Sequence, residues 1–159
     1  MTVETFVDSP RLKLKTIGQV AELIEIRFPD KEAKGLIISD IDGVGSLPRL
    51  IESYRQLLES RPRTELIFFT ARPLGFSLKG RVGSAIDPEH KRVWFCSDIK
   101  KFAVRVDPFV IEMARTRDWL VYVGSNKTFD LGCFEEISSG VFPPGKNSFF
   151  CQIGNHLFL

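Results

Sequence analysis

The stretch GLIISDIDGV, residues 35–44, decides the fold of this chain. It begins with an unbroken apolar run and turns acidic at Asp40 and Asp42. A continuous apolar run with a polar end is typical of a strand covered on both faces, as in a parallel sheet. Residues 35–39 are therefore predicted to form a buried strand that the two aspartates directly follow.

Strand-like and helix-like segments alternate along the rest of the chain. Apolar runs predict further strands at residues 65–69, 92–96 and 119–123, with a weaker one at residues 148–153. Helical spacing predicts helices from residue 17 to a stop at Pro29, at residues 48–60, after Pro108 and at residues 130–137. This alternation predicts an α/β fold, a doubly wound parallel sheet with helices on both faces.

Two local predictions follow from single residues. Gly75, Gly80, Gly83 and Pro88 favour a loop with at most a short helix across residues 71–91. The dipeptide Asp107-Pro108 is typical of a helix start, and that helix is predicted to bury Phe109 together with Val110 and Met113.

The 159 residues are predicted to form a single domain, because no repeat, low-complexity tract or linker divides them. Within it, residues 1–34 are predicted to be a helical lead-in, residues 35–137 the core and residues 138–159 a C-terminal extension. With 43% hydrophobic residues, a chain of this length can bury an ordinary core without disulfides or a structural metal.

The charge pattern does not favour a polyanionic partner. The net charge is +2 and no basic tract exceeds two residues, so there is no strong signal for nucleic acid or for an anionic membrane. The apolar runs are too short to span a bilayer, and the start of the chain does not resemble a signal peptide. Cys96, Cys133 and Cys151 are an odd set without a close pair, which indicates reduced, buried thiols in a cytoplasmic protein.

Polar residues follow each predicted strand. They are Asp40 and Asp42, Thr70 to Arg72, Ser97 and Asp98, and Ser125 and Asn126, with Asp130 shortly after. Ligands of parallel α/β sheets collect at the carboxyl ends of the strands. Two neighbouring carboxylates repel each other unless a cation lies between them, and hard oxygen ligands suit Mg²⁺. The alternative for Asp40 and Asp42 is a turn or helix cap, and for Asp130 it is the N-cap of the next helix.

An apolar strand with Asp40-Ile41-Asp42-Gly43-Val44, followed by a second strand and Thr70, resembles the haloacid dehalogenase (HAD) superfamily of phosphatases. The resemblance implies a core of the kind predicted above and an aspartyl-phosphate mechanism. In it Asp40 is the nucleophile, Asp42 is the general acid and base, and Thr70 holds the phosphoryl oxygens. Lys101 is the implied site cation, with Lys100 and Arg105 as alternatives.

The same resemblance implies the ligand sets of the site. Phosphate contacts are expected from Gly43, Thr70, Ala71 and Lys101, and Mg²⁺ ligands from Asp40, Asp42 and Asp130. The peptides SDIDG and ARPLG, residues 39–43 and 71–75, are also similar to those of lipin-type phosphatidate phosphatases. A phosphorylated substrate is therefore the expected partner.

Two features depart from the HAD pattern. Ser125 stands where the family has a metal-binding acid, so only the distal acid, Asp130, is retained. The segment between Asp42 and Pro48 is too short for a cap, which predicts an open site and a bulky phosphate ester as substrate. The alternatives are a degenerate HAD domain that binds or regulates without turnover, and a polynucleotide 3′-phosphatase, against which the low net charge argues.

Overall fold

Six parallel strands and five helices alternate along the chain in the computed structural model, which describes residues 11–41, 44–69, 76–89, 91–96, 108–125, 129–139, 142 and 147–153. The strands are β1 (Arg11–Leu14), β2 (Gly35–Asp40), β3 (Glu65–Phe69), β4 (Val93–Cys96), β5 (Trp119–Gly124) and β6 (Ser148–Ile153). The helices are α1 (Ile17–Arg27), α2 (Leu47–Ser60), α3 (Phe76–Ile86), α4 (Pro108–Arg115) and α5 (Phe129–Ser138).

The strands form one sheet in the order β1-β6-β5-β2-β3-β4, and every neighbouring pair is parallel. The predicted α/β fold with a doubly wound parallel sheet is thereby confirmed. The chain runs outward from β2 through β3 to β4, and it resumes on the other side of β2 with β5 and β6. The strand order therefore reverses between β2 and β5, and in such sheets ligands bind in the crevice at this switch point.

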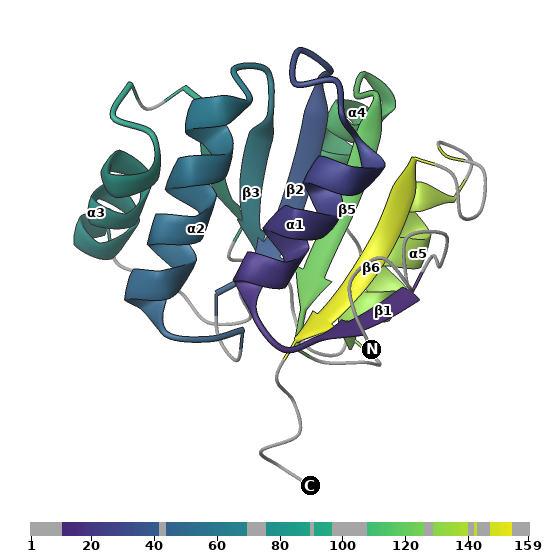
Figure 1. Cartoon of the computed structure of the whole chain (residues 1–159), viewed down its shortest axis with the longest axis horizontal. Helices are drawn as coiled ribbons and strands as arrows, with labels where there is room; N and C mark the ends of the chain where they lie inside the picture. Colours follow the sequence, from purple (N-terminus) through teal and green to yellow (C-terminus); the bar gives the residue numbers. More distant parts are fainter. Residues whose placement is uncertain are drawn as a thin grey trace, which may run out of the picture.

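Helices cover both faces of the sheet (Figure 1): α1, α2 and α3 lie on one face, and α4 and α5 lie on the other. Successive residues of a strand point to opposite faces. In β2, Ile37 accordingly packs under α1 and α2, whereas Leu36 and Ile38 pack under α4 and α5, and all three are fully buried. This two-sided burial explains why the central strands are continuous apolar runs.

Three sequence predictions need correction. Residues 76–86 form an eleven-residue helix, α3, although a loop with at most a short helix was predicted. A helical glycine costs about 1 kcal/mol, but Val82 and Ile86 are buried in the core and offset that cost. Phe109 is 49% exposed, because the buried stripe of α4 consists of Val110, Met113 and Ala114.

The third correction concerns the ends of the chain. The predicted helical lead-in also contains a strand, β1, which is only four residues long and pairs with β6. The predicted C-terminal extension supplies β6, as its weak strand pattern indicated, and β6 lies inside the sheet between β5 and β1. Among the helices of the described residues, none has both the length and the apolar character needed to cross a membrane.

Candidate functional site

Asp40 and Ser125 meet at the switch point of the sheet. Ser39 of β2 pairs with Val123 of β5, so Asp40 ends β2 beside Gly124, which ends β5. The next residue, Ser125, donates a hydrogen bond from its Oγ to Oδ2 of Asp40 over 3.0 Å. Both side chains are half-buried. The first predicted aspartate therefore lies where the fold concentrates ligand contacts.

A chain of hydrogen bonds holds the end of β2 in place. The hydroxyl of Tyr54 in α2 donates to Oγ of Ser39 over 2.7 Å, and Ser39 donates to the carbonyl oxygen of Asp40 over 2.8 Å. The backbone N–H of Ile41 donates to Oδ1 of Asp40 over 2.9 Å. Burial raises the pKa of Tyr54 well above its usual value near 10, so its hydroxyl keeps its proton. The Asp40 carboxylate is thus oriented from both of its oxygens.

Asp130 lies close to Gly124, in the first turn of α5. It is 3% exposed, and its Oδ1 accepts a hydrogen bond from the Tyr122 hydroxyl over 3.2 Å. A Cβ added to Gly124 would lie 2.5 Å from both Cβ and Oδ2 of Asp130, so this close approach requires glycine. Burial, and then the negative charge of Asp130, raise the pKa of Tyr122 well above its ordinary value.

The helix α5 begins at Phe129, so Asp130 lies inside its first turn and is not its N-cap. A carboxylate in the first turn interacts favourably with the helix dipole. That interaction and the Tyr122 hydroxyl offset part of the cost of burying the side chain. The N-cap alternative for Asp130 is therefore wrong.

The remaining predicted site residues lie outside the described residues. They are Asp42, Gly43, Thr70, Ala71 and Lys101, together with the alternative cations Lys100 and Arg105. Ser39 lies at the predicted strand end and bonds to Asp40, whereas the sequence pattern did not indicate that Tyr54 and Tyr122 also position the aspartates. Tyr54 lies four residues after Leu50 on the apolar stripe of α2, so its spacing indicated only a core residue.

The described side chains at this edge carry oxygen ligands of the type that Mg²⁺ prefers. In the part of the chain that the structure describes, no three His, Cys, Asp or Glu side chains are grouped closely enough to hold a metal. Mg²⁺, however, commonly uses one or two carboxylates and completes its shell with water or phosphate oxygens. The 3.0 Å between Asp40 Oδ2 and Ser125 Oγ is the length of the hydrogen bond that joins them and does not by itself identify a metal site.

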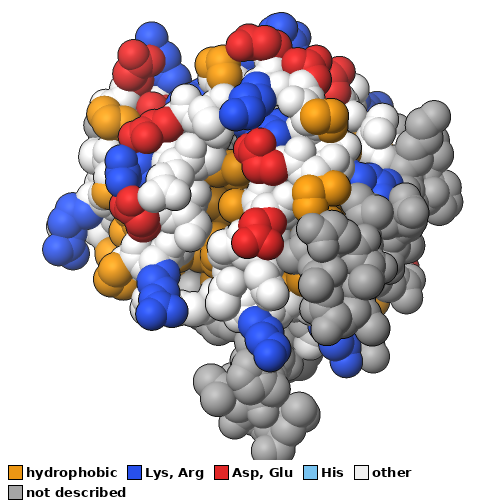
Figure 2. Space-filling model, viewed as in Figure 1, with side chains coloured by type: hydrophobic (Ala, Val, Ile, Leu, Met, Phe, Trp, Pro, Cys, Tyr) orange, Lys and Arg blue, Asp and Glu red, His pale blue; other side chains and the backbone are white. Residues whose placement is uncertain are grey.

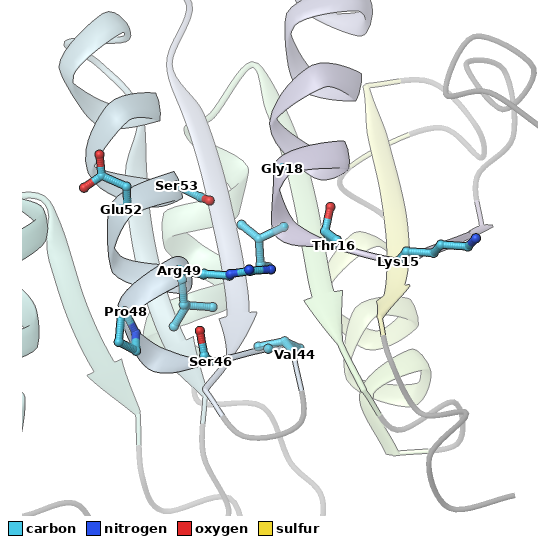
Figure 3. A pocket seen from close by; sticks show the side chains of 12 residues that line it. Lys15, Thr16, Gly18, Val44, Ser46, Pro48, Arg49, Glu52 and Ser53 are labelled. Atoms are coloured by element: carbon cyan, nitrogen blue, oxygen red, sulfur yellow. The ribbon is translucent and has the colours of Figure 1, made fainter.

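A groove of about 790 Å³ adjoins the segment that follows Asp40. It runs between the start of α1 and residues 44–53, and apolar side chains are visible in the hollow between α1 and α2 (Figure 2). Arg49 extends from α2 toward Thr16 at the start of α1, whereas the Lys15 side chain points away (Figure 3). Gly45, which lines the groove, has φ 125°, a value that favours glycine.

Comparisons with known proteins find no relative of this chain. The chain matches no protein-family model, and no curated protein or solved structure is similar enough to it to show a relationship.

Proposed function

We propose that this protein is a Mg²⁺-dependent phosphohydrolase of the HAD type. An oxygen of Asp40 attacks phosphorus and forms an aspartyl phosphate, while the ester P–O bond breaks and Asp42 protonates the leaving oxygen. Asp42 then takes a proton from water, the water oxygen attacks phosphorus, and phosphate leaves with the Asp40 carboxylate restored. Thr70 and Lys101 hold the phosphoryl oxygens in this proposal.

The observation that carries the proposal is the position of Asp40. Its carboxylate lies at the switch point and is oriented by Ser125 Oγ at 3.0 Å and by the Ile41 N–H at 2.9 Å. A nucleophile held in one orientation loses less entropy on the way to the transition state. The hydrogen bonds through Ser39 and Tyr54 couple this orientation to the buried core.

A magnesium ion would be held by Asp40 and Asp42, with Asp130 as the retained distal acid. When bound, Mg²⁺ neutralises the charge that develops on the phosphoryl oxygens. Ser125 offers a neutral oxygen in place of the family's acid, so we expect weaker metal binding than a carboxylate at this position would give. Ser125 already contacts Asp40, which keeps the carboxylate oriented in the absence of metal.

The groove beside residues 44–53 supports a bulky phosphate ester as the substrate. Its volume of about 790 Å³ falls within the range of small-molecule sites. Apolar side chains in the hollow would take the organic part, and Arg49 would contact an anionic group of it. We also assign the protein to the cytoplasm, because Cys133 and Cys151 are buried and are not joined in a disulfide.

The direct test is hydrolysis of an aryl phosphate with Mg²⁺ by the parent and by Asp40→Asn. We expect the substitution to lower kcat by about 10³-fold or more, because it removes the nucleophile. Asp30→Asn is the matched control, since Asp30 is an exposed aspartate outside the site. Activity that survives in Asp40→Asn would exclude Asp40 as the nucleophile.

The second candidate function is a binding or regulatory module that no longer turns over. It is favoured by Ser125, a neutral residue in hydrogen-bond contact with Asp40 where the family has an acid. Ser125→Asp should tighten Mg²⁺ binding, measured by calorimetry, and raise turnover, whereas Ser125→Ala should do neither. If the parent and Ser125→Asp both bind Mg²⁺ but hydrolyse nothing, the binding module is the correct function.

A further inference from the structure

The amino edge of the sheet, opposite the candidate site, carries a cluster of basic side chains. The neighbouring strands β5, β2, β3 and β4 are each preceded within two residues by at least one Lys or Arg. These residues are Arg117, Lys34, Arg63, Lys91 and Arg92. Together with Glu65, Pro62 and Trp94 they line a pocket of about 490 Å³, which we call the basic pocket. Five cations and one carboxylate therefore surround one cavity.

The cations of the basic pocket differ in what they already bind. Nη1 of Arg92 donates to three backbone carbonyls, those of Leu58, Arg61 and Thr64, so it has a structural role. Nη2 of Arg117 contacts Oε1 of Glu65 at 2.6 Å. The Nε of Arg117 is buried without a partner in the described part of the chain.

Lys34, Arg63 and Lys91 are exposed, and none of the three forms an ion pair with another described residue. Like charges gathered around one cavity repel each other, and an anion in the cavity relieves that repulsion. The local surplus of positive charge therefore favours an anionic ligand.

Side-chain to backbone hydrogen bonds hold the loops of this edge. The Asp87 carboxylate accepts from the backbone N–H groups of Lys91 and Arg92 over 2.9 and 2.8 Å. The Asp118 carboxylate accepts from the Lys34 N–H over 2.8 Å. Both acids are thus engaged by main-chain groups, and they fix the start of β4 and of β2. The cations are presented from ordered backbone, which lowers the entropy lost on binding.

We propose that the basic pocket binds a phosphorylated ligand of nucleotide size, with its phosphates on Lys34, Arg63 and Lys91 and its flat base against Trp94. Lysine and arginine are the usual partners of phosphate oxygens, and an indole is a good stacking surface for a base. Trp94 is partly exposed and lines the pocket. A volume of about 490 Å³ suits a single nucleotide better than a polymer track. The proposal is independent of the phosphohydrolase function.

The test is calorimetric titration of the full chain with ATP, tripolyphosphate, adenosine and a single-stranded oligonucleotide at constant ionic strength. ATP should bind more tightly than tripolyphosphate, and adenosine should bind weakest. Tryptophan fluorescence provides a second readout, because Trp94 is one of only two tryptophans and the other, Trp119, is 1% exposed. ATP should change the emission, and tripolyphosphate should change it less.

The discriminating variant is the triple substitution Lys34→Gln, Arg63→Gln, Lys91→Gln. It should weaken ATP binding about tenfold or more, because it removes three charge-assisted contacts. The triple control Lys13→Gln, Lys79→Gln, Arg81→Gln removes the same charge elsewhere and should change affinity less than about twofold. Equal weakening by both triples, no binding of either phosphate compound, or binding of the oligonucleotide alone would overturn the proposal.

Two further results concern the base and the proposed active site. Trp94→Leu should weaken ATP binding while leaving tripolyphosphate binding unchanged, and an unchanged ATP affinity would refute the role of Trp94. Asp40→Asn should leave ATP affinity at the basic pocket unchanged. Loss of ATP binding in Asp40→Asn would instead place the nucleotide at the carboxyl edge and refute the basic pocket.

Discussion

The two edges of the sheet are built in different ways. At the carboxyl edge, acids and hydroxyls bond to one another, as in the contacts Ser125–Asp40 and Tyr122–Asp130. At the amino edge, charged side chains bond mainly to backbone, as Arg61, Arg92 and Asp87 do. Side chains that bond to backbone hold loops in place, whereas an oriented carboxylate is suited to chemistry. The comparison indicates that side chains at the amino edge contribute more to the free energy of unfolding than those at the carboxyl edge.

The largest expected effect tests this difference at Arg61. Its side chain is fully buried and donates to the backbone carbonyls of Ile24 and Phe28 at the end of α1, the latter over 2.6 Å. Arg61→Met should lower the free energy of unfolding by about 3 kcal/mol, because the Phe28 carbonyl loses its guanidinium donor and the Ile24 carbonyl keeps only the Phe28 N–H. Urea denaturation measures the loss. The neighbouring exposed Arg63, replaced by Met, should cost less than about 0.5 kcal/mol, and equal losses would refute the special role of Arg61.

The next effect concerns the carboxyl edge at Gly124. Gly124→Ala should cost about 1–3 kcal/mol, because the new Cβ would lie 2.5 Å from Cβ of Asp130, close to the backbone of α5. Gly132→Ala is the matched control in α5, where nothing lies within 4 Å of the new Cβ. That control should gain about 0.5–1 kcal/mol of stability from helix propensity. If thermal unfolding shows that Gly124→Ala is as stable as the parent, Asp130 does not need this close packing.

A smaller effect concerns Asp87 at the amino edge and the stability of the protein at acid pH. Burial alone would raise the pKa of Asp87, but the N–H groups of Lys91, Arg92 and Glu89 hold it below its usual value near 3.8. A depressed pKa contributes stability that is present above pH ~4 and is lost as the pH falls through the folded value. Asp87→Asn should therefore lose about 1–2 kcal/mol at pH 7 and converge with the parent at lower pH. A constant difference between the two denaturation curves from pH 7 to pH 2 would contradict this origin.

The smallest effect concerns alkaline stability and involves thiols. Burial, and then the charge of Asp130, raise the pKa of Cys133 to about 11 from its usual value near 9, and burial raises that of Cys151 further. A raised pKa contributes stability that is fully present below pH ~9 and is lost as the pH rises toward the folded value. The parent should lose about 1 kcal/mol near pH 9.5 from Cys133. Between pH 8 and pH 10 the urea midpoint of Cys133→Ala should fall less steeply than that of the parent. An identical fall would exclude the Cys133 thiol as a source of the alkaline loss of stability.

Much of the fold was predictable from residues that are neighbours in sequence. The apolar run that ends at Asp40 predicted a two-sided buried strand, and the stripe of α2 followed from Leu50, Tyr54 and Leu57. The prediction failed where tertiary packing outweighed local preference. Glycines in residues 76–86 disfavoured a helix, yet burial of Val82 and Ile86 stabilises α3. The four residues of β1 are too few to show a reliable pattern, and pairing with β6 makes them a strand.

The amino-acid sequence by itself determined the alternation of strands and helices and the placement of Asp40 at a strand end, because periodicity and turn residues act over a few positions. Only the tertiary structure decided which strand ends are neighbours. It placed Ser125 on Asp40 across 85 positions of sequence, and it gathered cations from residues 34–117 around the basic pocket. The physical reason is that the pairing of parallel strands decides which strand ends are neighbours. Electrostatic interactions then depend on the distance between charged groups in space and not on their separation along the chain.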